Sequence, residues 1–345
     1  MERFDRSYGA LLGLALGDAL GYPAMFHRIF SLPERRRPRI WDNNRSLTAQ
    51  RIGRLYLPYT HRQSPDLLEP APSDDTEWML LSARALREAS GEPGRQTFVA
   101  AWQTHIVPHE AELVMGFSER AAIDNLKRGL LPPATGNDNP QHYDDSAAMR
   151  AVVSGLWYAG EPERAAALAQ ADAELTNAED GIYAARAMAA AIARLADGAS
   201  LQEAISAARA EFPAGSWLAH GDEIARACLA ESRSPLELAL HLARRLINTV
   251  YTFGNAAPET IPAALALCEI TAGDLHAGIL AANAIPKSAD SLPSLVGALC
   301  GALQGAQVVP ASWRVALNEA HGVAVPIVAG MRLDAVAREL SLRAH

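Results

Sequence analysis

The amino-acid sequence predicts an all-α protein, a single compact domain of many helices. Hydrophobic residues make up 49% of the chain but aromatic residues only 6%, so the apolar content is mostly Ala and Leu, which favour close-packed helices over sheets. Apolar residues recur at helical spacing, and no segment shows the alternation of a strand. The length of 345 residues allows one large domain or two ordinary ones. Because about ten or more helices are expected around one core, we assign residues 1–345 to one domain.

The chain begins with an expected helix over residues 7–20 and continues into a long irregular stretch. Small residues at close spacing in the first segment indicate a buried helix that packs tightly against its neighbours, and Pro23 ends it. Residues 25–73 are rich in Arg, Pro and Asn, so we interpret them as a long loop or insertion at the surface. Loops of this length in compact domains are often functional lids or disordered segments.

Helical periodicity resumes after residue 75 and continues to the end of the chain. In the first of these segments Trp78, Leu81 and Leu86 contribute to one apolar face. A second irregular stretch, residues 128–145, is rich in Gly, Pro and Asn. Helices are expected over residues 76–90, 95–105, 146–158, 162–175, 180–196, 201–212, 221–230, 235–250, 258–271, 274–284, 292–304 and 333–342.

The bulk composition narrows the classes of function. The formal net charge of -8 argues against a general nucleic-acid-binding surface, although it leaves room for a local basic pocket for a phosphate. Cys228, Cys268 and Cys300 are far apart and lack zinc-ligand spacing, so we expect buried free thiols in a reducing compartment. The sequence shows no signal-peptide layout and no uncharged stretch of membrane-spanning length, so we expect a soluble cytoplasmic protein without a membrane partner.

Two short polar runs, far apart in the sequence, suggest a metal site. Residues 73–76 (SDDT) supply a hydroxyl and two carboxylates at the start of one expected helix, and Asp290 and Ser291 supply a carboxylate and a hydroxyl at the start of another. Ligands that are all oxygen suit a hard cation such as Mg²⁺ or Mn²⁺. Ser and Asp are also the commonest helix N-caps, so plain capping explains either run taken alone. Asp18, in an apolar helix, needs a partner and is expected to be a hydrogen-bond hub beneath this site.

Five short motifs follow one another along the chain: residues 9–21 (GALLGLALGDALG), 73–76 (SDDT), 146–150 (SAAMR), 289–291 (ADS) and 310–313 (PASW). In this order they resemble five motifs of the ADP-ribosylglycohydrolases, the family of dinitrogenase reductase-activating glycohydrolase. These are the opening helix, the (S/T)DDT metal motif, the substrate-loop motif that ends in AMR, the (G/R)DxDT metal motif and a closing P-x-x-W. The joint order and spacing are specific, and the resemblance covers nearly the whole chain.

The resemblance implies an all-α fold, a pair of Mg²⁺ or Mn²⁺ ions and hydrolysis of an N- or O-glycosidic bond to ADP-ribose. In that case Asp74, Asp75 and Asp290 would be the catalytic metal ligands and would offset much of the charge of one or two ions. Ser73 and Ser291 would add neutral oxygen ligands. The ions would grip the ribose diol and position a water molecule.

The expected loop over residues 136–146 would shape the leaving-group side of the substrate. His142 and Tyr143 are candidates to stack on a base or a ribose, and simple packing is the equal alternative. Asp144 and Asp145 are candidates for a clamp on substrate hydroxyls, a general base or extra metal ligands, and helix capping is the equal alternative. The candidate substrate-binding residues are Gly136, His142, Tyr143, Asp144, Asp145 and Ser146.

Three departures from the family pattern bear on the chemistry. Ser288 stands where the second metal motif has an acidic residue, so one of two metals should bind more weakly. Met25 stands where many relatives have a glutamate, and methionine cannot take part in proton transfer. Asp144 and Asp145 stand near a turn that is often glycine-rich in relatives, and they would repel a diphosphate unless a metal or Arg150 intervenes.

We therefore expect a metal-dependent hydrolase of a glycosidic bond in ADP-ribose conjugates or a related nucleoside-derived substrate. Two alternatives stay open. The altered substrate loop also fits a related hydrolase with a different substrate. Ser288 and Met25 also fit a non-catalytic ADP-ribose-binding or regulatory protein that has lost part of a dinuclear metal site, whereas the presence of Asp74 and Asp75 argues against this. The sequence does not define the acceptor, and it is compatible with an oligomer.

Overall fold

The computed structural model describes residues 1–21, 70–248, 255–289 and 291–342, and in these ranges the regular structure is helical apart from two isolated β-bridges. The all-α class predicted from the sequence is therefore confirmed. Most of the expected insertion lies in residues 22–69, outside the described residues, so its conformation stays a prediction.

Long α-helices are joined by turns and short helices. The α-helices are α1 (Arg3–Leu20), α4 (Asp74–Glu88), α5 (Arg95–Ala101), α6 (Phe117–Lys127), α7 (Ala134–Asn137), α8 (Ser146–Trp157), α9 (Pro162–Ala173), α10 (Asp180–Asp197), α11 (Leu201–Ala210), α12 (Trp217–Glu231), α13 (Pro235–Arg245), α14 (Ala257–Ile270), α15 (Leu275–Asn283), α16 (Leu292–Gln304), α17 (Ala311–Leu317) and α18 (Leu333–Ser341). The shorter elements are the π-helix η3 (Trp102–Ile106) and the 3₁₀ helices η4 (Val107–Glu112), η5 (Pro286–Ser288), η6 (Ala306–Val308) and η7 (Pro326–Val328).

Local capping explains where one helix differs from the sequence expectation. The helix expected over residues 221–230 begins earlier, at Trp217. The hydroxyl of Ser216 accepts a hydrogen bond from the backbone N–H of Ala219, which satisfies one of the donors exposed at a helix start. The cap therefore extends the helix by a turn beyond its apolar repeat.

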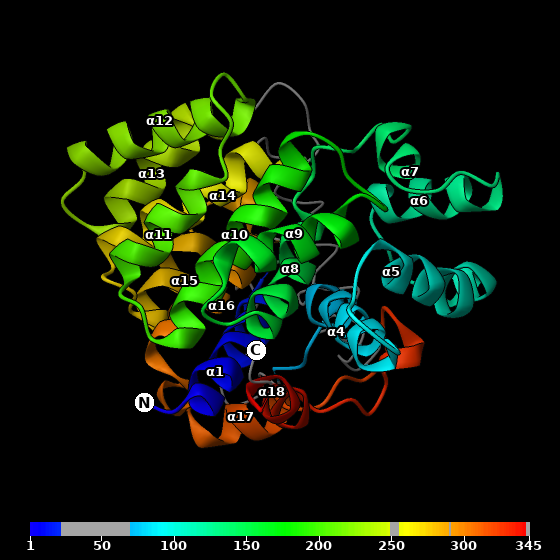
Figure 1. The fold of residues 1–345 in the computed structure, drawn as a ribbon. Coiled ribbons are helices and arrows are strands. Elements are labelled where there is room, and N and C mark those ends of the chain that lie inside the picture. Colours follow the sequence, from blue (N-terminus) through cyan, green and yellow to red (C-terminus); the bar gives the residue numbers. More distant parts are fainter. Residues whose placement is uncertain (22–69, 249–254, 290, 343–345) are drawn as a thin grey trace, which may run out of the picture.

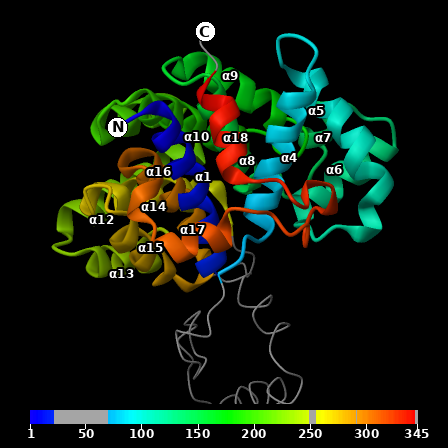
Figure 2. The same cartoon turned by 90° about the horizontal axis from the view of Figure 1, so that it is seen from below.

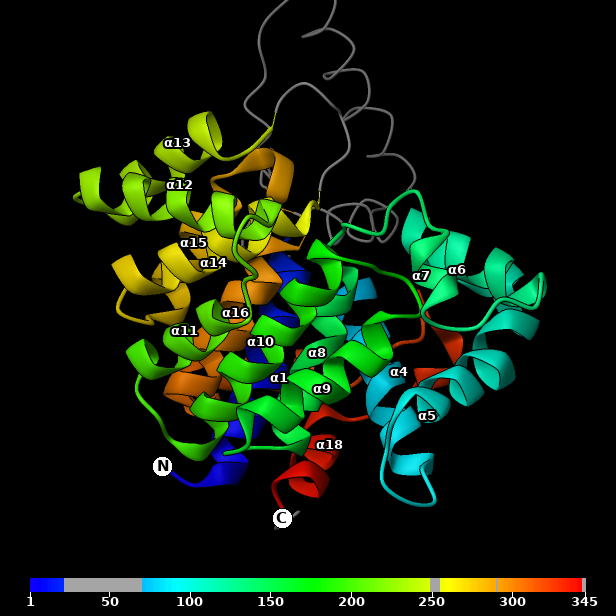
Figure 3. The same ribbon diagram turned by 45° about the horizontal axis from the view of Figure 1, so that its top comes forward.

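A central group formed by α1, α8, α10 and α16 is surrounded by the other helices (Figure 1). Helices α12 and α13 lie at one side of the molecule, and α5, α6 and α7 lie at the opposite side (Figures 1 and 3). Helix α18 packs against α1 and α8 (Figure 2). The candidate active site forms where ends of the central helices meet the side of the molecule that holds α5, α6 and α7.

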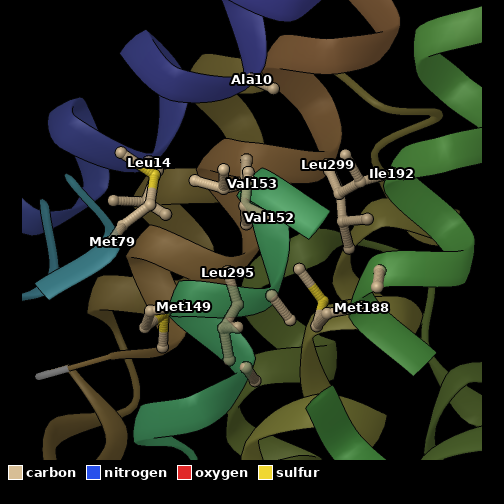
Figure 4. Packing of buried hydrophobic residues seen from close by; sticks show 14 of the residues in the cluster. Ala10, Leu14, Met79, Met149, Val152, Val153, Met188, Ile192, Leu295 and Leu299 are labelled. Carbon is tan, nitrogen blue, oxygen red and sulfur yellow. The ribbon is translucent and has the colours of Figure 1, made fainter. Parts of the chain in front are cut away.

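Apolar side chains from five helices meet in the core. Each side chain of the set is almost completely removed from solvent, and burial of one Leu, Val, Ile or Met side chain contributes roughly 1.5–3 kcal/mol. Figure 4 shows Leu14 of α1, Met79 of α4, Val152 of α8, Ile192 of α10 and Leu299 of α16 in this cluster.

Helices α1 and α16 run antiparallel and pack so closely that only glycine fits at their contact. A Cβ atom at Gly13 would lie 2.0 Å from the carbonyl oxygen of Gly297, and a Cβ atom at Gly297 would lie 2.0 Å from that of Gly13. Gly17, one turn further along α1, lies against the backbone of Pro293 at the start of α16. The contact therefore confirms the tight packing predicted for this segment, and it places the end of α1 beside the start of α16.

The structure also bears on the cysteines and on the question of membrane-spanning helices. Cys228, Cys268 and Cys300 are buried free thiols. None of the helices in the described part of the chain is long and apolar enough to cross a bilayer.

We predict that Gly13→Ala destabilises the fold. The added methyl group meets backbone atoms, which cannot rotate away, so we expect a loss of roughly 2 kcal/mol in the free energy of unfolding, even after the gain in helix propensity. Urea unfolding followed by circular dichroism measures the change. Gly91→Ala is the matched control, because nothing lies within 4 Å of a Cβ atom at Gly91. Equal stability of the two variants would contradict the prediction.

Candidate active site

The start of α4 is held by Asp18, near the end of α1. Its buried carboxylate accepts hydrogen bonds from the backbone N–H of Ser73 (2.7 Å), the backbone N–H of Thr76 (3.1 Å) and the Thr76 hydroxyl (2.6 Å). Burial, and then the charge of Asp74, hold the pKa of Asp18 well above its usual value. Ser73 occupies the N-cap position, but its side chain makes no cap hydrogen bond. Asp18 is therefore the hub that the sequence predicted, and it replaces Ser73 as the capping group.

The first turn of α4 also fixes the segment that leads into α6. The buried carboxylate of Glu77 accepts hydrogen bonds from the four successive backbone N–H groups of residues 322–325, at distances from 2.6 to 3.0 Å. Trp78 donates from Nε1 to the carbonyl of Val114 (3.3 Å), and the N–H of Val114 donates to the carbonyl of Ala324 (2.9 Å). Hydrogen bonds to a charged group are stronger than neutral ones, so the Glu77 carboxylate holds residues 322–325 tightly against the first turn of α4.

The starts of α4, α8 and α16 converge. Ser294, in the first turn of α16, donates to the Oδ2 atom of Asp75 across 219 sequence positions (2.6 Å). Ser291, which precedes α16, donates to the Oδ1 atom of Asp145, which precedes α8 (3.1 Å). The N–H of Asp145 donates to the carbonyl of Asn255 (2.9 Å). The two polar runs singled out in the sequence therefore face a common space.

These helix starts line a cleft of about 500 Å³. Among the described residues that line it, Arg120 alone is a lysine or arginine. Low-dielectric walls that carry one sign of charge attract the opposite sign, so the cleft favours a cationic ligand or a bound metal ion. The carboxylates of the lining belong to Asp74, Asp75, Glu119, Asp144 and Asp145.

The surroundings of Asp144 alter the acidity of its carboxyl group. Its Oδ1 atom accepts hydrogen bonds from Nδ2 of Asn177 (3.0 Å) and from the hydroxyl of Ser146 (2.9 Å). Burial, and then the Glu119 carboxylate, raise the pKa of Asp144 to about 6, although hydrogen bonds from Ser118, Asn177 and Ser146 act in the other direction. This carboxyl group can therefore gain or lose a proton close to neutral pH.

Arg150 of α8 is fully buried behind the cleft. Its Nε atom donates to both carboxylate oxygens of Asp172 (3.2 and 3.3 Å), and its Nη2 atom donates to the hydroxyl of Thr176 (2.8 Å). Its Nη1 atom lies 3.8 Å from the carboxylate of Glu119. The charge of Arg150 is therefore shared between two protein carboxylates and organises the wall of the cleft.

Lys287 is also paired within the protein. Its Nζ atom donates to the two carboxylate oxygens of Glu259 in the first turn of α14, at 3.0 and 3.4 Å. Glu259 is 1% exposed, and it also accepts a hydrogen bond from the backbone N–H of Asn248 (3.0 Å). The positive charge that the sequence places beside the second metal motif is therefore balanced by a buried carboxylate.

Of the site residues predicted from the sequence, six line the cleft: Asp74, Asp75, Asp144, Asp145, Ser146 and Ser291. Ser73 is completely buried, and its hydroxyl donates to Oδ1 of Asp74 (3.1 Å). Asp290 and Met25 lie outside the described residues. Their roles stay predictions.

Three predicted substrate-binding residues are not among the described lining of the cleft. A Cβ atom at Gly136 would lie 2.1 Å from the carbonyl oxygen of Asn177, so this glycine allows close packing of two segments. The rings of His142 and Tyr143 meet edge to face with centroids 5.5 Å apart, and Tyr143 also contacts Trp217. These contacts match the packing alternative left open for the two rings.

Sequence reasoning missed Glu119 and Ser294. Glu119 is 3% exposed and faces the cleft, yet a single glutamate in an amphipathic helix carries no distinguishing signal. Ser294 lies three positions after Ser291, on the same face of the first turn of α16, and this spacing was an available signal.

The donor chemistry of the cleft suits a hard cation. Asp74 and Asp75 contribute carboxylate oxygens and Ser291 a hydroxyl oxygen, which are ligand types that Mg²⁺ and Mn²⁺ prefer. The buried hydroxyl of Ser288 has no hydrogen-bond partner among the described residues. Within the same residues, no three His, Cys, Asp or Glu side chains form a group that could hold a metal ion alone. A bound ion would therefore also draw on water or on Asp290.

Comparisons with known proteins agree with this architecture. A family model described as ADP-ribosylglycohydrolase matches residues 1–344. A solved structure titled "ADP-ribosylglycohydrolase-related protein complex" is similar over 99% of this chain and 98% of that chain, with a TM-score of 0.62 and 22% sequence identity. At this identity the structural likeness shows the fold alone. No curated protein sequence matches the chain.

We predict that Asp144→Asn stabilises the metal-free protein more at pH 7.5 than at pH 5. The pKa of Asp144 is raised in the folded state, so stability is highest when the group is protonated and falls as pH rises through about 6. The amide removes the cost of the buried charge and keeps an acceptor oxygen. Melting temperatures in the presence of a chelator measure the effect, with Asp124→Asn at an exposed position of α6 as control. The same shift at both pH values would contradict the prediction.

Proposed function

We propose that this chain, which belongs to the ADP-ribosylglycohydrolase family, is a metal-dependent hydrolase of a glycosidic bond in ADP-ribose conjugates or a related nucleoside-derived substrate. The main support is the convergence of Asp75 and Ser291, from two distant runs of the sequence, on one acidic cleft. Such an arrangement costs stability because like charges repel, and a cation would relieve that cost.

The proposed cofactor is one or two Mg²⁺ or Mn²⁺ ions. When bound, they would supply Lewis-acid chemistry, polarising ribose hydroxyls and lowering the pKa of water. The hydrogen bond from Ser294 fixes the orientation of the Asp75 carboxylate, as partners of metal ligands commonly do. The proposed ligands are Asp74, Asp75, Asp290, Ser73 and Ser291.

The proposed substrate-binding wall is the start of α8. The N–H of Ala257 donates to the carbonyl of Tyr143, and the N–H of Asp145 donates to the carbonyl of Asn255, so the backbone that carries the two aspartates is held on both sides. Asp145 would orient substrate hydroxyls, and Asp144 would transfer a proton near neutral pH. Asp144, Asp145 and Ser146 line the cleft and are the candidates for direct contact, whereas Gly136, His142 and Tyr143 are not among its described lining and stay predictions from the sequence.

A non-catalytic ADP-ribose-binding or regulatory protein is the second candidate function. The observation that favours it is Ser288, a buried hydroxyl where the family motif has a carboxylate. The loss of one negative ligand would weaken one metal position, and the chemistry of a dinuclear site depends on both.

We also propose that residues 1–345 form one domain that works in the cytoplasm. A continuous apolar cluster that includes residues from α1 to α18 supports the first proposal. Three buried free thiols fit a reducing compartment, which supports the second.

We predict that Asp75→Asn lowers turnover about 10²-fold or more, because an amide removes one anionic ligand while it still accepts the hydrogen bond from Ser294. Metal-dependent product release would be measured with Mn²⁺ on ADP-ribosylated proteins, ADP-ribosylated nucleic acid and simple nucleosides. Asp124→Asn, exposed on α6, is the control. Full activity of Asp75→Asn would refute the assignment. If nothing turns over while ADP-ribose raises the melting temperature, the binding-protein candidate is favoured.

We predict that Mn²⁺ binds the wild-type protein at two positions of clearly unequal affinity, or at one position alone, because Ser288 supplies no negative charge. Calorimetric titration measures both affinities. Ser288→Asp should increase occupancy of the weaker position, whereas Ser288→Ala should not. Two equally tight positions in the wild-type protein would contradict this interpretation.

A further inference from the structure

The mouth of the cleft differs in chemistry from its interior. The carboxylates of Glu119, Asp144 and Asp145 are buried in the lining and those of Asp74 and Asp75 are partly buried, whereas the first turn of α6 adds an exposed aromatic ring and an exposed guanidinium. Phe117 is 61% exposed, and the side chain of Arg120 is 50% exposed. The two residues are three positions apart on one helix, so their side chains lie on the same face.

The first turn of α6 is held in place by contacts of its buried residues and of the segment that precedes it. Its inward residues are Ser118 and Glu119, which are almost completely buried. The hydroxyl of Ser118 lies 3.2 Å from that of Ser146 at the start of α8, and the carbonyl of Ser118 accepts a hydrogen bond from Nδ2 of Asn139 (2.9 Å). The preceding segment is fixed to α4 through Val114. The backbone that carries the ring and the guanidinium is therefore held beside the cleft that Asp74 and Asp75 also line.

The contacts of Arg120 within the described part of the protein are too weak to account for a guanidinium at this position. Its nearest described carboxylate is that of Glu110, at 4.0 Å, and exposed pairs of this kind contribute little to stability. Glu110 is paired more closely with Lys127. The guanidinium of Arg120 is thus the one cation that the described lining of the cleft offers to an anionic ligand.

We propose that Phe117 and Arg120 form the subsite for the nucleotide part of the substrate, with the ring stacked on the base and the guanidinium bound to the phosphates. The proposal rests on the proposed function, since it assumes a ligand that joins a ribose to a nucleoside diphosphate. Carboxylates in the interior repel phosphate groups, so the diphosphate needs a cation outside the proposed metal position. A guanidinium binds phosphate with two parallel hydrogen bonds, and base stacking on an aromatic ring tolerates different bases.

Binding of ADP-ribose to the Mn²⁺-loaded protein, measured by calorimetry, tests the proposal. We expect Arg120→Ala and Phe117→Ala each to weaken binding about tenfold or more. Phe117→Trp should retain the affinity for ADP-ribose. Arg120→Lys should bind ADP-ribose more tightly than Arg120→Ala but more weakly than the wild-type protein, because lysine keeps the charge but cannot form the two parallel hydrogen bonds of a guanidinium. Lys127→Ala, on the same helix and paired with Glu110, is the matched control and should bind like the wild-type protein.

Competition with ribose 5-phosphate separates the two contacts. Arg120→Ala should weaken this competitor, whereas Phe117→Ala should not, because the competitor has a phosphate and no base. Arg120 is half-exposed and its pair with Glu110 is long, so the melting temperature of Arg120→Ala should stay unchanged. If the wild-type protein binds ADP-ribose and the two alanine variants bind it equally well, the subsite is refuted while the proposed function stands. If the wild-type protein neither binds ADP-ribose nor releases product from any substrate, both are refuted.

Discussion

The contact between α1 and α16 is the constraint on which the cleft depends. Because Gly13 and Gly297 bring two backbones together, the end of α1 and the start of α16 are fixed beside each other. From this junction Asp18 reaches across to cap α4, and Ser294 reaches Asp75. A side chain at the contact would separate the helices and misplace both polar groups. Close packing in the interior thus sets distances between side chains that would bind a metal ion.

Positive side chains around the site are paired with protein carboxylates, whereas most carboxylates that line the cleft face no positive side chain among the described residues. The buried Arg150 is paired with the carboxylates of Asp172 and Glu119, and the partly buried Lys287 is paired with that of Glu259. The remaining carboxylates of the cleft have no lysine or arginine facing them among the described residues except at its mouth. A buried excess of one charge is unfavourable without a counter-charge, so this imbalance is the physical reason to expect a bound cation.

The sequence predicted the helical class, the tight packing of the first helix and the cleft carboxylates of residues 74–75 and 144–145, because glycine spacing and acidic helix starts are local patterns. It did not predict that Asp18 caps α4, since this depends on how two helices meet. Glu119 was missed because its role comes from its position in space. The alternatives for Asp144 and Asp145 stayed open because capping and ligand binding use the same residue types.

We have proposed that the starts of α4 and α16 together hold a metal ion. Crystals grown with Mn²⁺ and measured for anomalous scattering test this most directly. We expect an anomalous peak within coordination distance, about 2.0–2.6 Å, of oxygens from Asp75 and Ser291. A well-ordered structure at saturating Mn²⁺ with no peak in the cleft, or with Mn²⁺ bound only elsewhere, would contradict it.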